Sequence, residues 1–143
     1  MRSLVSLLLM LLAGAGLAAP PGVENAERAR VNYMLNCQGC HGPEGTGTLD
    51  GAVPAMKSFV GKFLSVSGGR EFLVQVPGSA NAALSDAALA EVLNWMLPQI
   101  SPAQIPADFE PYTAAEVAAL RRRPLEDVIG ERAKLIALMP DPL

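Results

Sequence analysis

Cys37-Gln38-Gly39-Cys40-His41 is the stretch that decides the fold. Two thiols one helical turn apart, followed at once by an imidazole, form the attachment pattern for a c-type haem. Each thiol can bond to a vinyl group of the macrocycle, and the histidine then supplies an axial nitrogen to the iron. His41 is the only histidine in the chain, so no second imidazole competes for the iron. We therefore expect one covalent haem c on Cys37 and Cys40, with His41 as the proximal iron ligand.

Three other chemistries use a pair of cysteines, and each fits the chain less well. A closed zinc site takes four ligands, whereas this chain has two cysteines and one histidine in total. A thioredoxin-like redox pair follows a strand in a βαβ unit, and no strand pattern precedes Cys37. A disulfide between Cys37 and Cys40 would leave His41 without a role. These three are the alternatives to haem attachment.

The amino-terminal segment has the pattern of a secretory signal peptide. Arg2 is followed by an apolar run at residues 4–12 and by small residues suited to cleavage. We expect residues 1–18 to be removed and the mature protein to be periplasmic, which agrees with haem attachment outside the cytoplasm. An uncleaved membrane anchor is the alternative, although the run is shorter than the ~20 residues of a membrane span. Membrane contact is expected only in that case.

Composition restricts the partners of the chain. Eleven Lys and Arg stand against 14 Asp and Glu, giving a formal net charge of −3. An acidic protein binds the phosphate backbone poorly, so we expect no nucleic-acid partner. The few lysines argue against a broad lysine-rich docking ring; they are Lys57, Lys62 and Lys134. The length suits one small domain, whose core a covalent haem would enlarge.

Apolar periodicity predicts an all-α chain. Ser85 is an expected N-cap, and Pro77 and Pro98 are expected to end helices. Prolines between residues 98 and 112 indicate an extended connector. The glycine-rich loop after the haem motif is expected to pass close around a flat ligand. The predicted helices occupy residues 24–35, 54–64, 70–76, 86–97, 113–123 and 125–139.

With these residues considered together, the chain resembles the small monohaem cytochromes c of class I. Residues 40–47 are similar to the family signature C-H-G-x-x-G-x-G, and Tyr33 matches the family's first helix. Pro54 occupies the place of the family proline whose neighbouring carbonyl orients the ligand histidine. Residues 84–86, followed by a helix with Trp95, resemble the closing helix. The resemblance implies a class I fold around one haem at residues 23–98, followed by a helical extension at residues 99–143.

The loop before the closing helix departs from the family. A methionine there usually supplies the sixth iron ligand, and Asn81 stands at that place in this chain. Asn81 is therefore one candidate distal ligand, and an open or water-filled site is another. Met56 is a further candidate, although it is close to Pro54 on the histidine side and also suits a core role. The other methionines, each with a packing alternative, are Met34, Met96 and Met139.

The resemblance implies an exported electron-transfer protein rather than an enzyme. It would carry single electrons, and its partners would be a dehydrogenase or a respiratory oxidoreductase. The missing loop methionine raises a first alternative, a high-spin or open-site haem protein that binds NO, CO or O2. A second alternative is a fixed haem subunit of a larger periplasmic dehydrogenase, docked through residues 99–143. In that case Arg121, Arg122 and Arg123 would meet an acidic partner or the haem propionates.

Overall fold

A computed structural model describes residues 19–140, and the expected signal peptide at residues 1–18 lies outside them. Within residues 19–140 the regular structure is entirely helical, as predicted. The elements are α1 (Ala26–Asn36), α2 (Gln38–His41), η1 (Val60–Ser65), α3 (Gly69–Gln75), α4 (Pro77–Ala80), α5 (Asp86–Ile100), η2 (Pro102–Gln104), α6 (Ala114–Arg121) and α7 (Val128–Ala137).

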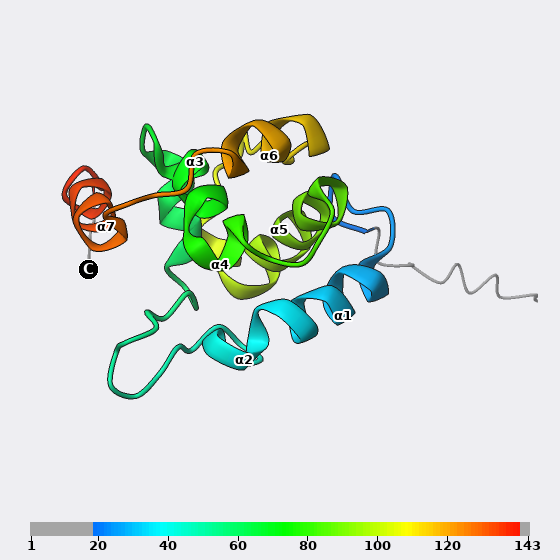
Figure 1. The fold of residues 1–143 in the computed structure, drawn as a ribbon. Coiled ribbons are helices and arrows are strands. Elements are labelled where there is room, and N and C mark those ends of the chain that lie inside the picture. Colours follow the sequence, from blue (N-terminus) through cyan, green and yellow to red (C-terminus); the bar gives the residue numbers. More distant parts are fainter. Residues whose placement is uncertain (1–18, 141–143) are drawn as a thin grey trace, which may run out of the picture.

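Helix α5 lies at the centre of the fold, with α1 on one side and α6 on the other (Figure 1). Ser85 begins the helix as predicted, because its side chain accepts a hydrogen bond from the backbone N–H of Ala88. The apolar stripe is fully covered, and its buried members are Leu89, Val92, Leu93, Met96 and Leu97. Because both sides of α5 are packed, the helix anchors the segments before and after it.

The prediction that Pro98 ends this helix is wrong. Helix α5 continues to Ile100 and contains Pro98 in its last turn. A proline removes one N–H donor from a helix, but Ser101 still donates its backbone N–H to the Leu97 carbonyl at 2.9 Å. The expected boundary between the haem domain and the extension at residue 98 therefore falls inside a helix.

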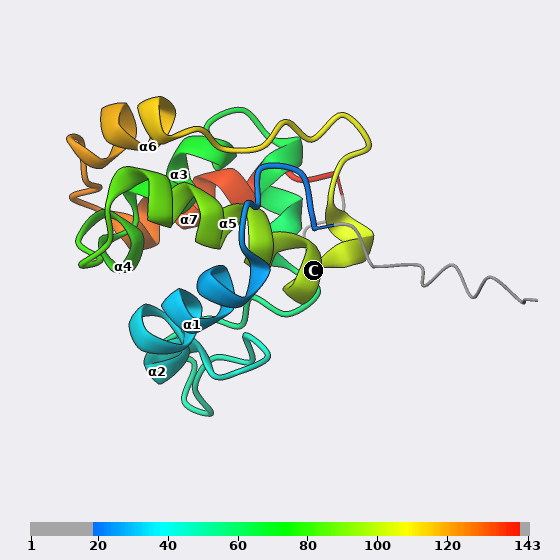
Figure 2. The same cartoon turned by 90° about the vertical axis from the view of Figure 1, so that its right-hand side faces the viewer.

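The segment after α5 folds back onto it and shares its core. Asn94, 1% exposed, donates to the carbonyls of Gly22 and Tyr112. It also accepts a hydrogen bond from the Tyr112 N–H at 2.7 Å. Val117 and Leu120 of α6 are buried against the same core. Figure 2 shows this connector and α6 lying along one side of α5.

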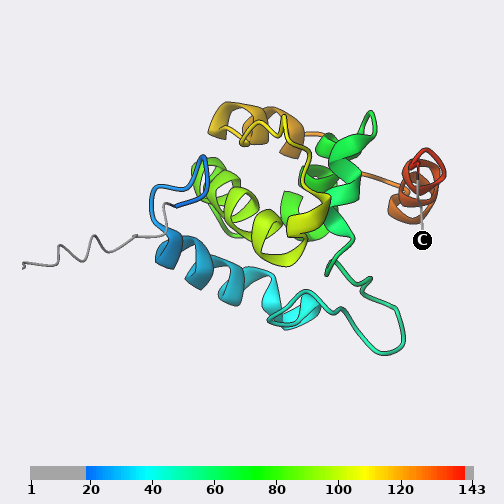
Figure 3. The same ribbon diagram turned by 180° about the vertical axis from the view of Figure 1, so that it is seen from behind.

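Two other boundaries differ from the prediction. Residues 54–59 are irregular, and the helical turn starts only at Val60, because Ser58 adopts a positive φ of 55° while its N–H bonds to the Ile100 carbonyl. Pro77 does not end the helical region but begins α4, where its missing N–H costs no helical bond. Residues 42–59, between α2 and η1, form a long loop that extends away from the helices in Figure 3.

Helix α7 lies at the edge of the molecule (Figures 1 and 3). Its N-cap, Asp127, accepts from the Gly130 N–H, so the helix begins later than the predicted residue 125. Leu135 and the following Met139 are buried in the core, and Arg132 lies 5.5 Å from the Phe59 ring centre. None of the helices within residues 19–140 has the length and apolarity needed to cross a membrane.

Candidate functional site

The end of α1 and the short helix α2 place the two thiols and the imidazole one turn apart. Cys37 interrupts the helix with a φ of −124°, and its carbonyl accepts from the N–H groups of Cys40 and His41 at 3.2 and 3.0 Å. Both cysteines are free thiols, Cys37 half-buried and Cys40 exposed. Because the thiols are unpaired and on one turn, they meet the requirement for two thioether bonds to one macrocycle.

His41 is a half-buried imidazole whose environment suits an axial iron ligand. Its Nδ1 is buried and has no hydrogen-bond partner among residues 19–140. Burial lowers the pKa of the imidazole, and the nearby Pro54 carbonyl opposes that effect only in part. The neutral ring is the form that coordinates iron. The structure thus puts the Pro54 carbonyl beside His41, the relation that the resemblance implied for this proline.

The buried phenol of Tyr33 fixes the segment that follows His41. Its hydroxyl donates to the Gly42 carbonyl at 2.8 Å, and its ring lies 5.8 Å from that of Trp95 on α5. Burial raises the pKa of Tyr33 to about 12, so the phenol stays a donor at neutral pH. Burial, with Cys40 nearby, likewise raises the pKa of the Cys37 thiol to about 11. The haem-motif side chains at the junction of α1 and α5 are therefore partly shielded from water.

The loop after His41 closes on itself on the histidine side. Gly47 donates to the His41 carbonyl at 3.0 Å, and its φ of +71° places it against the Val53 carbonyl oxygen, with which a Cβ would collide. The close approach at Gly47 is thus to the chain's own backbone. Met56 donates its N–H to the Gly45 carbonyl at 2.7 Å and is half-buried. Lys57 pairs with Glu44 across the same loop.

Two relatives decide the family. One cytochrome c-552 of Thermus thermophilus is 32% identical over 146 residues, covering 88% of this chain and 93% of the relative. A second cytochrome c-552 of Thermus thermophilus is 34% identical, covering 77% of this chain and 97% of its own length. The chain belongs to the monohaem c-type cytochromes. No family model and no solved structure matches it.

Membership confirms the expected class I fold and the covalently bound haem c. Cys37 and Cys40 would hold the macrocycle and His41 would ligate its iron, which fits the free thiols and the unpartnered Nδ1. Within residues 19–140, no group of three or more His, Cys, Asp or Glu side chains could hold a metal ion directly.

The similarity also reaches the carboxyl-terminal segment. Residues 1–98 make up about two thirds of the 143 residues, so an alignment that covers 88% of the chain must enter residues 99–143. At least part of the segment after α5 therefore aligns with this Thermus cytochrome.

The structure separates the candidate distal ligands of the cytochrome. Asn81 follows α4 and is exposed at its C-cap, while Met56 lies in the loop on the histidine side. Met96 and Met139 are buried in the core. Met34 is 43% exposed on α1, where its Sδ accepts from Arg30 at 3.3 Å. Of the candidates, Asn81 alone lies in the loop between α4 and α5.

Arg121 is a residue whose contacts could not be seen in the sequence. Its position at the end of α6 suggests only the favourable interaction of a cation with a helix C-terminus. In the structure its guanidinium instead binds the loop between α4 and α5, more than 30 residues away in the chain. Arg122 and Arg123, which follow it, are exposed.

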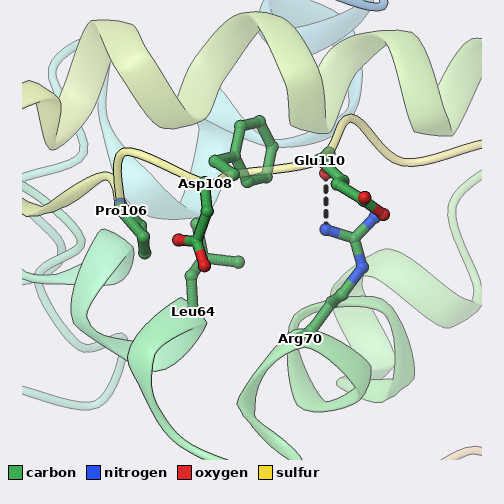
Figure 4. Close-up of a pocket in the computed structure, with 6 residues that line it drawn as sticks. Leu64, Arg70, Pro106, Asp108 and Glu110 are labelled. Carbon is green, nitrogen blue, oxygen red and sulfur yellow. Dashed lines mark hydrogen bonds between the residues drawn. The ribbon is translucent and has the colours of Figure 1, made fainter.

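A cavity of about 370 Å³ lies elsewhere, between η1, α3 and the connector (Figure 4). Arg70 lines it and donates to the Glu110 carbonyl at 2.6 Å, while its other nitrogens bind Glu116. The guanidinium also lies 4.0 Å from the ring centre of Tyr112. With its donors engaged, Arg70 ties the connector to α3, and none of the haem-motif residues lines this cavity.

Proposed function

We propose that this protein is an exported cytochrome that carries single electrons between redox partners. When bound, haem c supplies an iron that gains and loses one electron. The observation that carries the proposal is the turn of helix that joins two free thiols to a half-buried imidazole with an unpartnered Nδ1. The relatives of this chain, named as cytochromes, support it.

The chain's own residues have three tasks in this role. Cys37 and Cys40 would tether the cofactor, and His41 would ligate its iron. Tyr33 locks the backbone just after the ligand by its bond to the Gly42 carbonyl, so the imidazole is held in place between oxidation states. A rigid ligand set lowers the reorganisation that accompanies electron transfer.

The partners in this proposal are a dehydrogenase that reduces the cytochrome and a respiratory oxidoreductase that reoxidises it. Export through residues 1–18 would place all of them in the periplasm. The formal net charge of −3 supports partners that are proteins rather than nucleic acids.

A potentiometric titration of the purified haem protein tests the proposal. We expect one reversible, one-electron transition and fast reduction and reoxidation by small redox dyes. A haem that is not reversibly reduced, or that turns over a substrate as it is reoxidised, would contradict an electron carrier.

A second function is favoured by the loop between α4 and α5. Residues 81–85 hold Asn81 but no methionine, histidine, cysteine or lysine that would bind the iron strongly. A weakly held sixth position would take NO, CO or O2. The absorption spectrum of the ferrous protein, before and after addition of CO, separates the two functions. A low-spin spectrum that CO does not change would leave the carrier function alone.

A further inference from the structure

All the described side-chain contacts of Arg121 converge on one loop. Its Nε donates to the Ala80 carbonyl at 3.0 Å, and its Nη2 donates to the Ala82 carbonyl at 2.6 Å. Its Nη1 donates to the Leu84 carbonyl at 2.8 Å and to the Asp86 carboxylate at 3.0 Å. One side chain from α6 therefore holds every second carbonyl of residues 80–84 together with the first residue of α5.

These bonds are well protected and suited to the side chain that makes them. The Arg121 side chain is 17% exposed, so water competes poorly for its donors. A guanidinium is planar, permanently charged and carries five N–H donors, so it can bind several carbonyls at once. The backbone itself fixes only the start of the loop, where the N–H groups of Asn81 and Ala82 donate to the carbonyls of Pro77 and Ser79 at 3.0 and 3.2 Å. After that first turn, the described hydrogen bonds to the loop, at the carbonyls of Ala82 and Leu84, come from Arg121.

The loop lies on the side of the molecule that faces the haem motif. In Figures 1 and 2, α4 lies between α6 and α2, and the loop leads from α4 to α5. Arg121 therefore reaches the loop from the α6 side, and α2, which carries His41, lies on the other side of α4 in both views. Asn81 lies within the held segment.

From this arrangement we infer that Arg121 is a positioning residue for the distal side of the haem. It holds residues 80–86 in place, and so limits the access of external ligands to the sixth position of the iron. The inference rests on the proposed function, because it requires a haem iron on His41. It holds for Asn81 as a ligand and for an open site alike, since in both cases a loosened loop would admit ligands faster.

Imidazole binding to the ferric haem protein tests the inference. The variant Arg121→Gln removes the guanidinium group that binds the loop. The matched control, Arg122→Gln, removes the same charge from an exposed neighbour. We expect imidazole to bind the Arg121→Gln protein at least about tenfold faster than the wild type, because the loop opens more often once its bonds are lost. The Arg122→Gln protein should bind at the wild-type rate. Equal rates in the two variants would overturn the inference.

Two further variants keep the test decisive if Arg121→Gln folds poorly. Arg121→Lys keeps the charge but cannot span the three carbonyls, so it should speed binding by an intermediate factor. Asp86→Asn removes only the ion pair and should leave the rate near that of the wild type. Wild-type rates in Arg121→Lys, or acceleration in Asp86→Asn alone, would contradict the role of the carbonyl contacts.

The haem content of each protein separates this inference from the proposed function. A wild-type protein without covalent haem would refute the proposed function, and with it the role of Arg121. Fully haem-loaded variants whose imidazole rates are alike, but whose melting temperatures differ, would refute only the positioning role. Rate and melting temperature must therefore be measured on the same preparations.

Discussion

Glu91, a buried carboxylate on α5, binds the first turn of α1 and the residues just before it to the central helix. Its Oε1 accepts from the backbone N–H groups of Glu24 and Asn25 at 3.0 and 2.9 Å. Arg28 donates to both carboxylate oxygens at 2.7 and 2.8 Å. The hydrogen bonds from Arg28 lower the pKa of Glu91, although burial opposes them. A carboxylate that is only 5% exposed thus remains charged because its donors surround it.

At the residue scale, we predict that Glu91→Gln destabilises the protein at neutral pH and flattens its response to acid. The folded pKa lies below the unfolded value of roughly 4.3. The contribution of Glu91 is therefore complete above that value and is lost as pH falls through the folded pKa. Two backbone N–H groups lose a charged acceptor, which costs about 1–2 kcal/mol of unfolding free energy at pH 7.

Urea unfolding at a series of pH values measures this effect. The difference between the wild type and Glu91→Gln should be constant near pH 7 and should shrink below about pH 4, near the unfolded carboxyl pKa. Glu126→Gln changes an exposed carboxylate and serves as the control. A difference that grows as the pH falls would contradict the sign of the argument.

Single residues also decide how much of the site can be predicted from the sequence. The haem motif is local in the chain, so Cys37, Cys40 and His41 could be assigned from their spacing alone. The contacts of Arg121 could not, because they join segments more than 30 residues apart. The identity of the sixth iron ligand could not be predicted for the same reason. It depends on the position of a loop in space, and no local motif around Asn81 marks that residue as a ligand.

At the scale of elements, the loop from α2 to η1 depends on a close backbone approach at Gly47. A Cβ there would collide with the Val53 carbonyl oxygen and would lie 2.8 Å from the Pro54 carbonyl carbon. Gly51 has a similar φ of +75°, but its Cβ would meet nothing within 4 Å. A side chain at either position would therefore adopt the same unfavourable positive φ, and only at position 47 would its Cβ also collide with another part of the chain.

We predict that Gly47→Ala is much more harmful than Gly51→Ala. Both variants place an alanine in the left-handed region, which costs roughly 1 kcal/mol, but only Gly47→Ala displaces the Val53–Pro54 backbone, which carries the carbonyl beside His41. In thermal unfolding of the haem-loaded proteins, the free energy of unfolding should fall further for Gly47→Ala than for Gly51→Ala, by about 1–3 kcal/mol, the typical cost of overpacking. The reduction potential should shift only in that variant. Equal losses in the two variants would contradict the close approach.

The helices themselves show where local sequence suffices. Ser85 caps α5 and Thr113 caps α6, as their side chains and the following apolar stripes predict. The irregular run before η1 depends instead on the bond from Ser58 to Ile100, a contact from a distant segment. Pro98 was misleading because, this close to the helix end, one missing donor does not stop the helix.

At the scale of the whole molecule, residues after α5 belong to the main core. Their buried apolar and aromatic side chains are Tyr112, Val117, Leu120, Leu135 and Met139. The sequence predicts a division at residue 98, because the resemblance to the class I cytochromes covers only about residues 24–97. In the structure, α6 covers the side of α5 that faces away from α1, so residues on both sides of that division pack together.

We predict that removal of residues 102–143 abolishes cooperative folding, whereas removal of residues 124–143 weakens it. Burial of each large apolar side chain contributes roughly 1.5–3 kcal/mol, and the whole stability of a domain is only roughly 5–15 kcal/mol. The longer deletion loses all five buried side chains and leaves the polar groups of Asn94 without Tyr112. The shorter one loses only those of the α7 region.

Circular dichroism during heating measures this outcome on haem-loaded proteins. The longer deletion should melt without a sharp transition, and the shorter one should melt sharply at a lower temperature than the full chain. A longer deletion that melts like the wild type would show that the segment merely lies on the surface.

The covalent attachment of haem underlies every role assigned to this chain, and mass spectrometry of the purified protein tests it most directly. After denaturation and proteolysis, the peptide that contains Cys37 and Cys40 should carry the mass of one haem, bonded through both sulfurs. The double variant Cys37→Ala, Cys40→Ala should lack it. A mature wild-type protein whose peptide has two unmodified thiols would contradict the account.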